Sequence, residues 1–323
     1  MTETFHSLCN CRNSDSAIQF FVDNKSAFEI PLQTVQQAVV QGKHEVGIEL
    51  LQDDKDAAGE SLCEVRIVVP DVRPPDGEMD IDNGEELETA AQLFCKEIQN
   101  KGDIGESTSK AIATFELFLA VPRGRYDVDL YETFLKLHNK TYSYKIPYKN
   151  VSKMFLFDAS QQTQQHLFVI GLEPPVRQGR TAYPFLVVQF DSAIMIEQSF
   201  AVDEATCEEK YNGLLKPIMK GPQHDVVTRV FKALTKKKVL VPGGSYQSKA
   251  GGSCVRCSYK AQDGLLFMLE KSFFFAKKPP MHIRHNQITS IEFDRVGSLA
   301  TGSSKTFDLK INTKDGKNNE YRM

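Results

Sequence analysis

The chain has 323 residues, of which 41% are hydrophobic and 25% charged, and its formal net charge is −3. This composition is typical of a soluble globular protein, and the length predicts two or three domains because it exceeds what one ordinary core serves. The seven cysteines are odd in number and unevenly spaced, which favours a reducing compartment over a disulfide framework. The first residues form no secretory signal. The best apolar stretch, residues 111–121, is too short to span a bilayer.

The small net charge conceals a strong asymmetry. Residues 71–90 contain eight acidic residues against one Arg, whereas residues 232–284 contain eleven Lys or Arg against Asp263 and Glu270, a net charge of +9. An acidic insert beside a basic C-terminal half suits charged macromolecular partners such as nucleic acid or histones, although ordinary surface charge remains an alternative.

Residues 18–70 read as short strands separated by polar turns, and residues 71–84 as an acidic, solvated loop. Residues 86–100 can form one helix. From residue 112 the strands resume, and we expect six or seven antiparallel strands before an amphipathic helix in "HDVVTRVFKALTKKK". A Gly/Ser-rich linker at 242–253 leads to a second run of strands, with a hairpin turn at Asp263-Gly264.

One short pattern occurs three times. Ile30-Pro31 and Val35 recur as Ile146-Pro147 and Val151, and again at Ile283 and Ile288, where Arg284 replaces the proline. The wide separation of the copies indicates domain duplication. Strands followed by a closing helix predict a mainly β fold of tandem pleckstrin-homology-like barrels, each closed by a C-terminal helix, with the last barrel lacking its helix.

We therefore expect five segments. Residues 1–70 form a partial pleckstrin-homology-like β domain, and residues 71–110 an acidic loop and a helix. Residues 111–240 form the first middle pleckstrin-homology-like domain. Residues 241–253 are a linker, and residues 254–323 form the second middle domain, without its C-terminal helix.

No arrangement in the sequence indicates catalysis, and the chain is expected to be neither an enzyme nor dependent on a cofactor. Cys254-x-x-Cys257 with His282-x-x-His285 raises the possibility of a zinc site. On a strand, however, residues three apart point to opposite faces. We therefore predict no metal site, with one cysteine buried and the other at the surface.

Surface recognition remains. Arg123 and Arg125 fall at a strand-to-strand turn, a lysine triplet ends the amphipathic helix, and further cations flank the third repeat. The triplet also complements the helix dipole, which is an equally good structural explanation. The candidate contact residues are Arg123, Arg125, Lys236, Lys237, Lys238, Lys271, Lys277, Lys278 and Arg284.

Four stretches carry a resemblance to a known family: "VPRGRYDVDLYETFLKLHNKTYSYKIPYKNV", "VIGLEPPVRQGRTAYPFLVVQF", "VTRVFKALTKKKV" and "CSYKAQDGLLFMLEKSFFFAKKPPMHIRHNQI". They resemble the structure-specific recognition protein family, the small subunit of the FACT histone chaperone, from about Ile18 to about Ile311. The chain looks truncated at both ends relative to that family.

The resemblance implies a nuclear, chromosomal protein that binds histones, H3 and H4 above all, and reorganises nucleosomes during transcription, replication and repair. It also implies pairing with the large FACT subunit through a domain that this chain mostly lacks. The alternative is a DNA-binding module that acts through the basic face of residues 232–284. A membrane partner is not expected, because the hairpin after Arg125 carries Asp127, Asp129 and Glu132 instead of a phosphoinositide-binding cluster.

Overall fold

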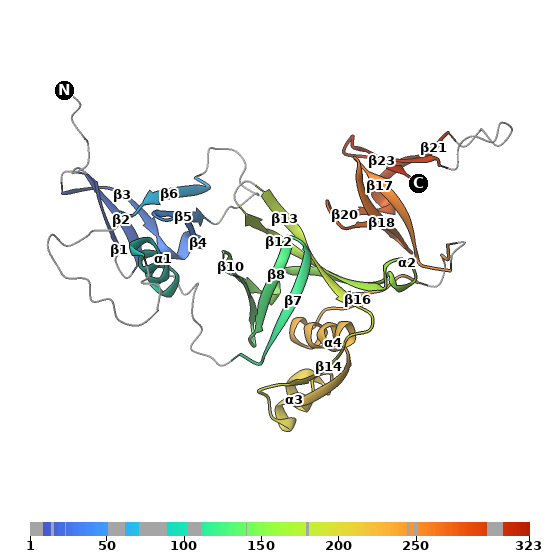
Figure 1. The fold of residues 1–323 in the computed structure, drawn as a ribbon, viewed down its shortest axis with the longest axis horizontal. Helices are drawn as coiled ribbons and strands as arrows, with labels where there is room; N and C mark the ends of the chain where they lie inside the picture. Colours follow the sequence, from blue (N-terminus) through green and yellow to red (C-terminus); the bar gives the residue numbers. More distant parts are fainter. Residues whose placement is uncertain are drawn as a thin grey trace. The chain divides into compact units, whose positions relative to one another are not determined.

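The computed structural model describes residues 9–13, 16–22, 24–50, 62–70, 89–101, 111–139, 141–178, 181–243, 246–248, 251–295 and 306–323. The chain divides into two compact units (Figure 1), one of Met1–Lys110 with Lys136–Ile146 and one of Ala111–Leu135 with Pro147–Met323. The mainly β prediction is confirmed. The predicted domain limits stay a prediction, and the acidic loop at 71–88 lies outside the described residues.

The first unit contains two three-stranded antiparallel sheets, ordered β1-β2-β3 and β4-β5-β6. Helix α1 begins at Ala90 and ends at Lys101, close to the predicted 86–100. It buries Ala91, Cys95 and Ile98, one face at helical spacing, in a core shared with the strands. The strands are β1 (Cys9–Asn13), β2 (Ala17–Val22), β3 (Lys25–Pro31), β4 (Val35–Gln41), β5 (Glu45–Leu50) and β6 (Glu64–Val68), and the 3₁₀ turn η1 is Leu32–Thr34.

An eight-stranded sheet, ordered β10-β9-β8-β7-β13-β12-β11-β16, follows and is called the first barrel here. Its strands are β7 (Ala113–Val121), β8 (Arg123–Leu130), β9 (Phe134–His138), β10 (Ser143–Pro147), β11 (Val151–Asp158), β12 (Gln165–Gln178), β13 (Thr181–Asp191) and β16 (Val239–Leu240), with the turn η2 at Tyr148–Asn150. The hairpin of β14 (Met195–Ser199) and β15 (Ile218–Pro222) is a separate two-stranded sheet.

The prediction of six or seven antiparallel strands and one helix was too simple for this region. The described residues form nine strands before α4 (Gln223–Thr235), and two further helices, α2 (Ser160–Thr163) and α3 (Glu204–Tyr211). The short strand β16 pairs with β11 in parallel. These elements are short or weakly amphipathic, so hydrophobic periodicity gives little signal for them.

Helix α4 is the predicted amphipathic helix. Val226, Val227, Val230, Phe231 and Leu234 are buried, as their spacing requires. The ring of Phe231 meets Phe168 of β12 edge-on, with the centroids 5.4 Å apart. The helix is therefore held to the first barrel by its apolar face.

A seven-stranded sheet, ordered β20-β19-β18-β17-β23-β22-β21, forms the second barrel. Its strands are β17 (Cys254–Tyr259), β18 (Gln262–Leu269), β19 (Ser272–Ala276), β20 (Met281–Arg284), β21 (Ile288–Asp294), β22 (Asp308–Thr313) and β23 (Asn318–Arg322), with the turn η3 at His285–Gln287. In the described part of this chain no helix follows β23.

The predicted hairpin turn at Asp263-Gly264 is wrong. The β17–β18 turn falls at Lys260 and Ala261, which both adopt positive φ (46° and 62°), the conformation of a primed hairpin turn. Gly264 lies within β18, where a Cβ would come within 2.3 Å of the ring of Phe275. Glycine at this position leaves the space that the aromatic ring occupies.

The repeated pattern forms the same corner three times: strand β3, β10 or β20, then a 3₁₀ turn, then strand β4, β11 or β21. Residues Pro31, Pro147 and Arg284 precede the three turns with φ of −61°, −60° and −76°, all extended. The isoleucine before each of them is buried. Arg284 thus takes up the backbone conformation that the proline ring fixes in the other two copies, and it donates its backbone N–H to Gln287 Oε1 at 3.2 Å.

Candidate interaction surface

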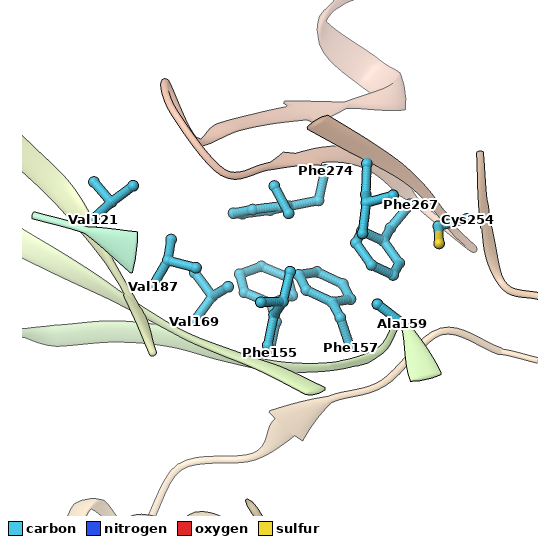
Figure 2. Packing of buried hydrophobic residues seen from close by; sticks show 12 residues of the cluster. Val121, Phe155, Phe157, Ala159, Val169, Val187, Cys254, Phe267 and Phe274 are labelled. Carbon is cyan, nitrogen blue, oxygen red and sulfur yellow. The ribbon is translucent and has the colours of Figure 1, made fainter. Parts of the chain in front are cut away.

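The two barrels of the second unit meet through a buried apolar layer, called the junction here (Figure 2). The first barrel contributes seven residues and the second barrel five. They are Val121, Phe155, Phe157, Ala159, Leu167, Val169 and Val187, and Cys254, Leu265, Phe267, Phe274 and Ala276. Phe274 is fully buried here, while its neighbour Phe275 is fully buried on the other face of β19, in the core of the second barrel. Strand β19 is therefore core on both sides.

Aromatic rings dominate the junction. Phe157 stacks on Phe267 with centroids 4.2 Å apart, and Phe274 lies 5.1 Å from both Phe155 and Phe157. Such pairs contribute about 0.5–1.5 kcal/mol each beyond their area burial. At one side, Gln162 of α2 donates its side-chain amide to the carbonyl of Cys254 at 2.8 Å. The contact between the barrels thus combines dry packing with polar bonds.

Four cations on neighbouring segments of the two barrels are called the rim here: Lys237, Lys153, Arg284 and Lys271. Lys237 donates its ammonium to the carbonyl of Val151 at the start of β11. Lys153 is two residues further along β11, and Arg284 interacts with it electrostatically. Arg284 pairs with Ser272 in the β19–β20 ladder, directly after Lys271. Three of the nine predicted contact residues therefore gather at this rim.

The remaining members of the lysine triplet, Lys236 and Lys238, follow the end of α4. Lys236 ends the helix in the left-handed conformation, with φ of 55°, and Lys238 is exposed. The triplet lines a hollow of about 410 Å³, together with Lys210 and Lys232. Helix C-termini carry a partial negative charge, so these lysines also have the structural role considered above.

The other predicted contact residues are not placed at the rim by the structure. Lys277 and Lys278 follow the far end of β19, whose five residues span about 17 Å at the usual strand rise. Arg123 and Arg125 begin β8, and Arg125 forms a 2.9 Å ion pair with Glu116 across the β7–β8 hairpin. The nine candidate residues therefore do not form one continuous surface. The contact role of these four residues stays a prediction.

The Cys254–Cys257 pair corrects one expectation. The two side chains do point to opposite faces of β17, but both are buried, one in the junction and the other in the second barrel. Burial raises the pKa of Cys254 to about 11 and that of Cys257 to about 12. The prediction that one of the two cysteines lies at the surface is wrong, because the docked first barrel covers the outer face of the strand. Within the described ranges, no group of three or more His, Cys, Asp or Glu is arranged to hold a metal ion.

His282 is a further residue at the edge of the junction. Its ring lies 5.3 Å from Phe155 and pairs across the ladder with Phe274. Burial, reinforced by the charges of Lys153 and Arg284, lowers the pKa of His282 to about 4. The imidazole is therefore neutral at physiological pH and behaves as part of the apolar layer.

Three family models match successive parts of the chain. They are "Structure-specific recognition protein (SSRP1)" over residues 9–100, "SSRP1 PH domain" over 110–239 and "Histone chaperone Rttp106-like, middle domain" over 253–323. The "FACT complex subunit pob3" of Schizosaccharomyces pombe is 39% identical over 312 residues, which is 95% of this chain. The chain belongs to the structure-specific recognition protein family. The predicted tandem pleckstrin-homology-like fold agrees with these matches and is confirmed.

The human member, "FACT complex subunit SSRP1", is 40% identical over 300 residues, or 93% of this chain. The chain spans 60% of the length of the fission yeast relative and 40% of the human one. Among solved structures, "Structure of the Spt16D Pob3N heterodimer" covers 67% of this chain and 96% of its own, with 13% identity and a TM-score of 0.27. That similarity is too low to support an argument. The relatives are named as FACT complex subunits and one family model as a histone chaperone, and these names agree with the non-catalytic prediction.

The structure places two further residues at the edge of the junction: Lys153, which the sequence did not single out, and His282, which the sequence suggested only as a possible zinc ligand. Lys153 and His282 lie 129 positions apart, in different barrels, and meet only because the barrels dock. Strand periodicity could have identified Lys153, because Lys153, Phe155 and Phe157 are at every second position and therefore share one strand face. None of the helices in the described ranges has the length and apolarity needed to cross a membrane.

Proposed function

We propose that the chain is a non-catalytic, histone- and nucleosome-binding subunit of a FACT-like chaperone. It acts in the nucleus, on chromosomes, where it reorganises nucleosomes during transcription, replication and repair. The observation that supports this most is the succession of three matches along the chain, the last of them named for a histone chaperone. Histones H3 and H4 are the favoured partners, and the large FACT subunit is a second partner.

Separate titrations with the H3–H4 pair and with the other core-histone pair test the proposal. We expect a defined complex with H3–H4 in size-exclusion chromatography with light scattering, at physiological salt. Binding that appears only at low salt would indicate charge attraction alone. The absence of any complex with either histone pair would contradict the proposal.

A second candidate function is contact with DNA, and the rim favours it. Histones are themselves rich in Lys and Arg, so a row of cations does not complement them, whereas DNA phosphates do. The rim residues lie on or next to neighbouring strands, and none of them forms an ion pair with a residue that the structure describes. Phe273 is half-buried against the core and the ring of His285, so the rim offers no aromatic platform for single-stranded bases. Duplex DNA is therefore the favoured nucleic acid.

Fluorescence anisotropy with a labelled duplex at several salt concentrations tests this function. The logarithm of the association constant should fall linearly with the logarithm of salt, with a slope of about −0.9 for each phosphate contacted. The variant Lys153→Gln removes one positive charge and should make that slope shallower by the value of about one phosphate contact. Lys216 is exposed in the loop between α3 and β15, and Lys216→Gln is the matched control that should leave the slope unchanged. Equal slopes for all three proteins would exclude the rim as the DNA site.

A further inference from the structure

Lys153 and Arg284 face each other across the two barrels. Lys153, Phe155 and Phe157 alternate on the face of β11 that enters the junction. On β20, His282 and Arg284 share a face, and His282 pairs with Phe274 of the junction. The 5.3 Å contact between Phe155 and His282 brings the two strands together. The next outward side chains on each strand are Lys153 and Arg284.

The two cations meet without a counter-charge. Among the described residues, the charges that act on Lys153 and His282 are those of other cations, and no carboxylate contributes. Neither Lys153 nor Arg284 forms a salt bridge with the residues that the structure describes. Lys153 is half-buried. Its pKa is lowered mainly by burial and secondly by the positive charge of Arg284. Like charges at the edge of a low-dielectric layer repel, and this repulsion opposes docking of the barrels.

We propose that a phosphate group binds between Lys153 and Arg284 and thereby strengthens the docking of the two barrels. The guanidinium supplies a planar fork for two phosphate oxygens and the ammonium a point charge from the opposite barrel. This coupling rests on the second candidate function where the phosphate belongs to DNA. Because coupling is reciprocal, whatever holds the barrels together also tightens phosphate binding.

A purely structural role for the pair gives the opposite expectation. Were Lys153 and Arg284 only solvated surface residues, phosphate would change nothing at the junction beyond general salt effects. Cys254 is a built-in reporter that separates these cases, since it is buried in the junction, whereas Cys257 is buried in the second barrel. Its thiol becomes accessible when the barrels separate.

The experiment measures thiol alkylation of Cys254 and Cys257 by peptide mass spectrometry in the full chain. It compares sodium chloride with inorganic phosphate at equal ionic strength and pH, and adds a short duplex as a third arm. We expect phosphate to slow alkylation of Cys254 roughly two- to fivefold, the range of a partly exposed charge interaction. Cys257 should be unaffected. Lys153→Gln and Arg284→Gln should abolish the phosphate effect and, in chloride, alkylate more slowly than the unchanged chain.

Lys216 is exposed in the loop between α3 and β15, and Lys216→Gln is the control variant that should respond to phosphate like the unchanged chain. Protection by both free phosphate and duplex supports the proposal with either source, and protection by duplex alone assigns the phosphate to DNA. Unchanged Cys254 alkylation in both arms, or equal protection in Lys153→Gln, overturns the proposal. If the duplex binds in anisotropy without slowing alkylation, the coupling fails while the DNA function stands. If free phosphate slows alkylation and the duplex does not bind, the DNA function fails while the coupling between phosphate and docking stands.

Discussion

Phe155 and Lys153 project from the same face of the same strand, yet one belongs to the dry interior of the junction and the other to its charged rim. The second barrel shows the same change, from Phe274 through the neutral His282 to Arg284. One step of strand alternation, about 6.6 Å, separates packing that holds the barrels together from charges that oppose it. Packing in the centre of the junction thus stabilises the docking of the barrels, whereas the like charges at its edge oppose it.

The largest effect is expected in the interior of the junction. Phe274→Ala should lower the free energy of unfolding by about 3–5 kcal/mol, because it removes a fully buried ring and leaves a cavity. Urea-induced unfolding measures this loss. Phe275→Ala, equally buried on the other face of β19, is the matched control. Under native conditions only Phe274→Ala should speed alkylation of Cys254, and equal acceleration by both variants would show that the barrels do not open separately.

The edge of the interior should be sensitive to pH. In the unfolded chain His282 binds a proton below about pH 6.5, but in the folded chain its pKa is about 4. The unfolded state therefore binds more protons between these values, and stability falls as the pH drops from about 6.5 to 4. The loss is at most about 3 kcal/mol. Urea unfolding of the chain and of His282→Gln at pH 7 and pH 5 measures the difference, which vanishes if His282 is not buried at the junction.

A smaller effect is expected where the rim meets the first barrel. Lys237→Met should cost about 1.5 kcal/mol, because the carbonyl of Val151 loses a charged donor. Lys238→Met should leave the free energy of unfolding nearly unchanged, since Lys238 is exposed. Thermal and urea denaturation of both variants provide the comparison. Equal stability of the two variants would mean that the Lys237 bond contributes nothing.

The smallest effect is expected at an ion pair that is already neutralised. Arg125 and Glu116 have side chains that are 80% and 62% exposed, so Arg125→Gln should change stability by no more than about 1 kcal/mol. It should also leave the salt dependence of duplex binding unchanged, in contrast to Lys153→Gln. A large reduction in the salt slope would show that DNA contacts the β7–β8 hairpin as well as the rim.

The sequence was sufficient where periodicity reflects burial in one domain. The alternation of Tyr126, Val128 and Leu130 and the helical spacing of Val226, Val230 and Leu234 both led to elements that the structure contains. The three corners were found from the spacing of buried Ile and Val alone. These patterns are local, so each can be read without knowing what packs against it.

The sequence was insufficient where a second barrel covers a strand face. Cys254 was expected to share a strand with a surface partner, because an alternating strand normally has one solvated side. Docking buries both sides, and the same event brings Lys153 beside Arg284. The short strand β16 escaped prediction for a similar reason, since two residues carry no period and the pairing with β11 is non-local. Contacts of this kind depend on tertiary structure that no single stretch encodes.

The third corner shows what duplication made available. Two copies retain a proline, whose ring fixes the bend but offers no functional group. In the third copy a capping box with Gln287 accompanies the same bend without the ring, and the position carries a guanidinium. The same position of the turn thereby carries a side chain whose charge acts on Lys153 of the other barrel. A corner that constrains only the backbone leaves its side chain available for contact with a neighbouring domain.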